Sequence, residues 1–115
     1  MNAKDRENLS LIISYCEDVI YAVARFGDEE EEFINDKFYQ YCTSFCIMQV
    51  GECVKRLSEE FKAGHPDVPW KAASGTRDRY SHDYGHADTH RAWLTVSRDI
   101  PAFLESCRKI MDSEA

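Results

Sequence analysis

The 115-residue chain carries 14 lysines and arginines against 21 aspartates and glutamates, has a formal net charge of −7 at pH 7, and is 43% hydrophobic. These values fit one globular domain over residues 1–115. They exclude a membrane-spanning helix, because no apolar run approaches the roughly 20 residues that a span needs. The acidic balance also argues against broad, salt-driven coating of nucleic acid, although a local basic cleft remains compatible with it.

The first predicted element is an amphipathic helix over about residues 4–26. Its apolar residues recur at three- and four-residue steps: Leu9, Ile12, Ile13, Cys16, Val19, Ile20 and Val23. Gly27 follows as a natural C-terminal stop. The acidic run at residues 28–32 is typical of a solvated helix start or loop.

A second helical region is predicted over about residues 30–63, and Asn35-Asp36 can divide it into a short piece and a long one. Its apolar face is wide: Phe38, Tyr41, Cys42, Phe45, Ile47, Met48, Val50, Val54, Leu57 and Phe61. Such a face indicates a central helix, or one buried against both its own bundle and a second subunit. We expect Phe38, Tyr41, Phe45 and Met48 to suit a dimer interface.

The second half of the chain predicts two more helices. Asp67-Val68-Pro69-Trp70 forms the entry to a third, shorter helix, and Gly75 inside it weakens that prediction. Asp88 is expected to cap a last helix over about residues 89–112, which Pro101 should kink. With no alternating strand pattern, the fold predicted is all-α: an antiparallel four-helix bundle with room for a short extra helix.

The segment from Arg77 to Tyr84 has the spacing Arg-x4-His-x-Tyr, with His82 as the histidine. Arginine can hold a phosphate and histidine can move a proton near neutral pH, so the pair suits phosphodiester chemistry without a metal. On an unbroken helix the two residues diverge by more than a quarter turn. They converge if the helix ends near Ser81, or they meet across a dimer axis. From spacing alone, surface charges, a capping histidine and a packed tyrosine remain the simpler interpretation.

A wider pattern reverses that balance, because the chain resembles the HEPN superfamily and is most similar to its HepT-type toxins. The resemblance covers nearly the whole chain and depends on elements in this order: Gly51-Glu52, Pro66-Asp67-Val68-Pro69-Trp70, Arg77-x4-His82-x-Tyr84, Trp93 and Asp99-Ile100-Pro101. Two departures are visible. Asp78 replaces a small polar residue, often asparagine, and Gly85 replaces a bulky aromatic.

The resemblance implies a homodimeric four-helix fold and a metal-independent endoribonuclease that acts through the 2′-hydroxyl of RNA. It implies that Arg77 holds the scissile phosphate, that His82 is the general acid or base, and that Asp78 orients one of them. Arg79 would add positive charge to the cleft. Tyr84 would be the residue to which a cognate nucleotidyltransferase antitoxin attaches AMP. The alternative is a non-catalytic, nucleotide- or partner-binding helical subunit of a two-component nucleotidyltransferase complex.

Glu52 shares the apolar face of Phe45 and Met48. It either pairs with Arg77 or His82, or it lies at the edge of the face and reaches water.

No metal or cofactor is expected. The five cysteines are odd in number and accompany no secretion signal, which favours a reducing cytoplasm. Cys42 and Cys46 fit small apolar positions on a helix better than a metal site. His82, His86 and His90 fall at four-residue steps, but Gly85 breaks the register, and we expect surface histidines.

Overall fold

The computed structural model describes residues 1–83 and 88–114, and within residues 77–83 it describes the backbone alone. All the regular structure in those residues is helical: α1 Ala3–Phe26, α2 Glu30–Ile34, α3 Lys37–Arg56, α4 Glu59–Ala63, α5 Trp70–Asp83, α6 Thr89–Leu94, a π-helical turn η1 Thr95–Asp99, and α7 Ile100–Ser113. The all-α prediction is therefore confirmed. None of the described helices is long and apolar enough to cross a membrane.

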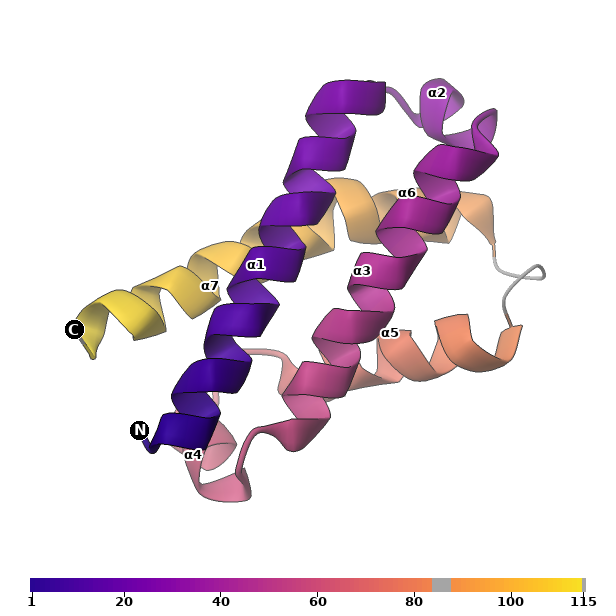
Figure 1. Ribbon diagram of the computed structural model, residues 1–115. Coiled ribbons are helices and arrows are strands. Elements are labelled where there is room, and N and C mark those ends of the chain that lie inside the picture. The colour runs from indigo at the N-terminus through magenta and orange to yellow at the C-terminus, as the bar shows by residue number, and fades with distance from the viewer. Residues whose placement is uncertain (84–87, 115) are drawn as a thin grey trace.

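The four long segments form two crossing pairs. Figure 1 shows α1 and α3 antiparallel in front, with α5 and the α6–η1–α7 arm crossing behind them in opposite directions. Helix α3 packs against both α1 and α5, and α1 also packs against α7. Helix α3 is thus the centre of the bundle, as its wide apolar face predicts.

Local capping signals set most helix ends. Helix α1 ends at Phe26 because Gly27 adopts φ 118°, in the region that favours glycine, and donates its N–H to the carbonyl of Val23. Asp36 caps α3 by accepting hydrogen bonds from the N–H groups of Phe38 and Tyr39. The predicted break at Asn35-Asp36 is confirmed.

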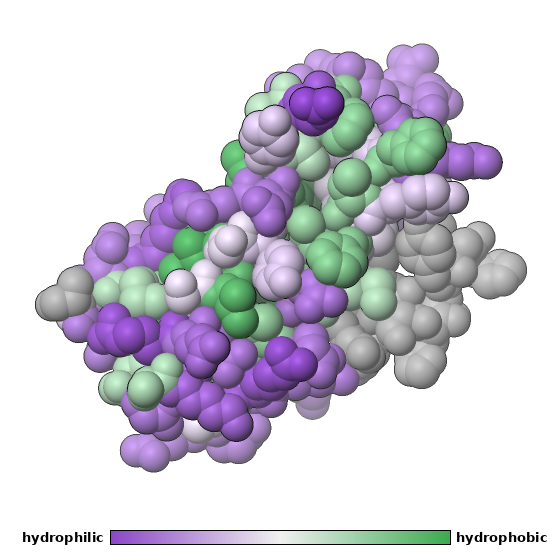
Figure 2. Space-filling view, viewed as in Figure 1, coloured by the Kyte–Doolittle hydropathy of each residue, from purple (hydrophilic) through white to green (hydrophobic). Residues whose placement is uncertain are grey.

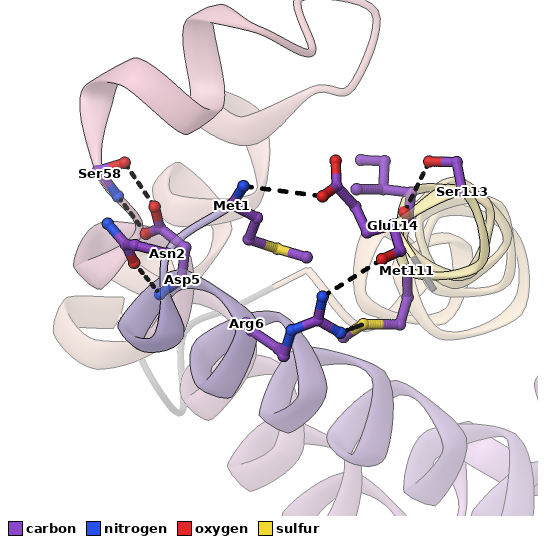
Figure 3. A network of polar contacts seen from close by, with 9 residues as sticks. Met1, Asn2, Asp5, Arg6, Ser58, Met111, Ser113 and Glu114 are labelled. Atoms are coloured by element: carbon purple, nitrogen blue, oxygen red, sulfur yellow. Dashed lines mark hydrogen bonds and ion pairs between the residues drawn. The ribbon is translucent and has the colours of Figure 1, made fainter.

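The prediction of one long helical piece up to Ala63 is wrong, because α3 ends at Arg56 and α4 starts at Glu59. Leu57 and Ser58 are extended between them. The buried carboxylate of Asp5, on α1, accepts from Ser58 N–H at 2.8 Å and from Ser58 Oγ at 2.7 Å (Figure 3). Ser58 Oγ in turn accepts from the N–H of Phe61 and caps α4. Asp5 therefore stabilises this corner of the chain.

Replacing Asp5 with alanine should lower the free energy of unfolding by about 2–3 kcal/mol, because it leaves the Ser58 N–H without its charged acceptor. Chemical denaturation followed by circular dichroism measures this change. The conservative variant Asp5→Asn keeps an acceptor oxygen and should lose less. An Asp5→Ala protein as stable as the parent would show that the corner does not depend on this carboxylate.

The last predicted helix is interrupted, and Pro101 gives the reason. Pro101 lies in the first turn of α7 and has no N–H to donate to the carbonyl of Ser97. The chain accommodates it by widening one turn, so that Ile100 N–H bonds to the carbonyl of Thr95, five residues back. The predicted kink is thus a π turn, which adds a residue to the helix before α7 begins.

An aromatic cluster joins the two pairs of helices. The rings of Phe33 and Trp93 lie 5.5 Å apart between centroids, and the fully buried Tyr39 contacts both. Tyr39 donates its hydroxyl to the carbonyl of Gly27 at 2.8 Å. Burial, with the nearby carboxylates of Glu32 and Asp28, raises the pKa of Tyr39 to about 12. This buried phenol therefore contributes to the core as a neutral group.

Candidate active site

Helix α5 carries the predicted motif, and Trp70 anchors its first turn. The Trp70 indole is buried and donates its N–H to the carbonyl of His65 at 3.0 Å. Its ring contacts Phe61 and Phe103, at centroid distances of 5.8 and 5.7 Å. Because these partners come from α4 and α7, the start of α5 is fixed against two other parts of the bundle.

The backbone of α5 runs unbroken from Trp70 to Asp83, and therefore past Ser81. Arg77 and His82 both lie on this helix, about 140° apart around its axis. The helix ends at Asp83, two residues after Ser81, so His82 is still helical and the helix end does not bring the two residues together within one chain. Asp78 and Arg79 lie on the same turns, but the side chains of all four residues are outside the described part, as is the whole of Tyr84.

The chain that follows the motif is also held in place by contacts with other helices. Asp88 caps α6 by accepting from the N–H groups of His90 and Arg91, as predicted. His90 Nδ1 lies 2.9 Å from Glu30 Oε2, which links α6 to α2. Trp93 then enters the core beside Phe33. Two buried tryptophans therefore bracket the motif segment.

A groove of about 570 Å³ opens between α5 and the α6–η1–α7 arm. Its floor is apolar and includes the buried side chains of Ile47 and Val50 from α3 and Phe103 from α7. The wall on the α5 side is built from small residues, among them Ala72 and Gly75. A Cβ atom added at Gly75 would meet nothing within 4 Å, so this wall leaves open space.

The opposite wall of the groove is polar. It presents Arg91 from α6 and Thr95 and Asp99 from η1, while Thr76 faces it from α5. The hydroxyl of Thr95 donates to the carbonyl of Arg91. Arg91 and Asp99 are exposed. Of these residues the sequence had singled out only Asp99, within the Asp99-Ile100-Pro101 pattern, and no signal in the sequence pointed to Arg91 or Thr95.

Glu52 lies at the edge of the apolar face of α3, with its side chain 35% exposed. Its carboxylate forms an ion pair with Arg56 Nη2, one turn later, at 3.7 Å. A partly exposed carboxylate beside an arginine carries no large desolvation cost. The side chain therefore reaches water, and pairing of Glu52 with Arg77 or His82 remains a prediction.

No cluster of metal-ligating side chains occurs among the residues whose positions are described. Cys16, Cys53 and Cys107 are buried, Cys46 is half-buried and Cys42 is exposed. Burial raises the pKa of Cys107 to about 12 and that of Cys46 to about 11, so these thiols stay protonated and unreactive. His90 is exposed, as predicted, while His82 and His86 lie among the residues whose side chains are not described.

Comparison with known proteins gives one consistent family. The family model described as "Ribonuclease HepT-like" matches residues 7–110. The protein named "Putative RNase MJ1216" of Methanocaldococcus jannaschii is 32% identical over 100 residues, which cover 87% of this chain and 81% of that protein.

Two further relatives agree with this. "Putative RNase TTE0752" of Caldanaerobacter subterraneus subsp. tengcongensis is 31% identical over 95% of this chain and 96% of its own length. "Probable ribonuclease HepT" of Thermococcus cleftensis is 32% identical over 70% of this chain and 73% of its own. No solved structure gives a significant match. The chain belongs to the Ribonuclease HepT-like family.

Proposed function

We propose that this protein is a metal-independent endoribonuclease whose chemistry depends on Arg77 and His82. The observation that carries the proposal is the Arg-x4-His motif on an anchored helix, in a chain that matches the Ribonuclease HepT-like family over residues 7–110. The names of the relatives, which call them ribonucleases, support the same activity.

In the proposed reaction the 2′-oxygen of a ribose attacks the adjacent phosphorus and the bond to the 5′-oxygen of the next nucleotide breaks. A 2′,3′-cyclic phosphate and a 5′-hydroxyl result. His82 takes the proton of the 2′-hydroxyl or gives one to the leaving oxygen, and Arg77 stabilises the extra negative charge on the phosphate oxygens. Asp78 orients one of these groups, and Arg79 adds positive charge nearby. These residue types need no metal for this reaction.

We further propose that the active unit is a homodimer. An apolar stripe on α3, formed by Phe38, Tyr41 and Phe45, is exposed by 72%, 50% and 57%. Figure 2 shows hydrophobic side chains gathered over this part of the molecule, and Met48, the fourth residue predicted for the interface, is half-buried. Exposed aromatics in one stripe are typical of an interface. A second copy would also supply a second motif, which suits an Arg77 and a His82 that lie on different sides of one helix.

The activity is tested with purified protein freed of any partner, incubated with a structured RNA in EDTA. Cleavage products ending in a 2′,3′-cyclic phosphate, identified by mass, are the expected result. Nucleotide binding without turnover of RNA would contradict the proposal and would instead favour the non-catalytic subunit.

We also propose that the protein is the toxin of a toxin–antitoxin pair, with a nucleotidyltransferase as antitoxin that attaches AMP to Tyr84. A phosphate group in a cleft that binds phosphate should block RNA through repulsion and bulk. Co-expression with such an enzyme should add one or more AMP units to the intact mass of the wild-type protein. The Tyr84→Phe variant should gain none at this position, and an equal gain in both proteins would contradict this assignment.

A further inference from the structure

We infer that the groove between α5 and the α6–η1–α7 arm binds a guanine base of the RNA substrate, with the carboxylate of Asp99 as the group that recognises it. The inference rests on the proposed ribonuclease activity and assigns it a base preference.

The shape of the groove suits a flat, mostly apolar group. Its volume of about 570 Å³ lies within the usual range for ligand sites. The floor from Ile47, Val50 and Phe103 offers an apolar contact to a base, and the small residues Ala72 and Gly75 leave the α5 side open. A larger residue on that wall would close the groove.

The polar wall supplies the recognition. Asp99 and Arg91 both line the groove, and neither side chain makes a hydrogen bond or ion pair with any residue that the structure describes. They are therefore available to a ligand. The π turn that Pro101 imposes places Asp99 in this wall, and π turns inside helices often occur at functional sites.

A carboxylate selects among the four bases by its chemistry. It only accepts hydrogen bonds, and the Watson–Crick edge of guanine offers it two adjacent donors, N1–H and the N2 amino group. Adenine and cytosine present one amino group beside an acceptor that repels the carboxylate, and uracil presents a single N–H between two carbonyls. Arg91, on the same wall, can meet the phosphate of that nucleotide.

The position of the groove links it to the motif. Thr76 lines the groove and directly precedes Arg77 on α5. A base in the groove therefore lies along the same helix as the residue proposed to hold the scissile phosphate. This continuity, together with a carboxylate and a guanidinium on one wall that pair with none of the described residues, favours an RNA nucleotide as the occupant over an apolar side chain of a second copy.

The test measures cleavage of short RNAs that differ only at one base, G, A, C or U, beside a fixed cleavage site. Wild-type protein should cleave the guanine substrate faster by about tenfold, the discrimination expected from a bidentate contact to a base. Asp99→Asn, which places an amide donor against the guanine donors, should lose most of this preference. Asp112→Asn, an exposed aspartate of α7 outside the groove, is the matched control and should keep it.

A second pair of variants tests the groove itself. Gly75→Leu should fill the open space and raise KM for the guanine substrate, and Gly75→Ala, which adds a single methyl group, should raise it less. Cleavage by wild-type protein without base preference, or a preference that Asp99→Asn leaves unchanged, would overturn the inference while the ribonuclease activity stands.

Binding provides a readout that does not need cleavage. Fluorescence anisotropy of the same labelled RNAs on the His82→Ala protein should show tighter binding of the guanine RNA, lost when Asp99→Asn is added. If wild-type protein fails to cleave any RNA but this selective binding is seen, the proposed function fails and the groove site stands. Equal binding of all four RNAs would contradict the groove site.

Discussion

RNA cleavage in EDTA should fall by about 10²–10⁴-fold in the His82→Ala variant, while the melting temperature stays close to that of the parent. The fall is the usual effect of losing a general acid or base, and alanine is a good helix former, so α5 should persist. Single-turnover kinetics with a labelled RNA measure the first quantity and circular dichroism the second.

The matched control is His90→Ala, which removes an exposed histidine that lies eight residues after His82 in the chain. His90 contacts Glu30 on α2 and lies on α6, outside the motif, so this variant should cleave RNA at the parent rate. If His82→Ala is as active as the parent, the histidine has no part in the chemistry and the assignment of the motif as catalytic fails. If both variants lose activity equally, the loss comes from damage to the fold and not from removal of a catalytic group.

The helices that could be predicted from the sequence are those whose ends are set locally. Gly27, Asp36 and Asp88 act on residues within one turn, and each ends or starts a helix where it was expected. The break at Ser58 was missed because its main partner is Asp5, 53 residues earlier in the chain. A weaker local signal was present, since a serine followed by two glutamates is a common helix start.

The same distinction between local and long-range signals applies to the candidate site. The motif at Arg77 and His82 is contiguous and could be read directly, and the structure adds that its helix is continuous and anchored by Trp70. The groove could not be read, because its floor and walls come from helices far apart in the sequence. The sequence predicted a kink at Pro101, but it did not predict that the chain would accommodate the proline with a π turn, or that Asp99 would then line the groove.

Replacing Phe45 with glutamate should convert a dimer into a monomer and should abolish most RNA cleavage. Phe45 lies in the exposed α3 stripe. Its ring contacts the ring of Tyr15 on α1 edge to face, with 6.3 Å between the two centroids. A charge at the centre of an apolar interface must be desolvated without a partner, which costs several kcal/mol of association energy. The isolated fold should change little because the ring is 57% exposed. Light scattering gives the mass of each protein.

Lys109→Glu is the control, because it adds a negative charge at an exposed position of α7 outside the stripe and should leave both mass and activity unchanged. A complementation experiment then tests whether the Arg77 and His82 of one active centre come from different subunits. Arg77→Ala and His82→Ala proteins should each be inactive. Mixed dimers regain one intact centre if each centre takes its arginine from one subunit and its histidine from the other. A wild-type monomer that cleaves RNA would contradict the dimer proposal. Inactive mixed dimers, confirmed by mass, would place Arg77 and His82 of each centre on a single subunit.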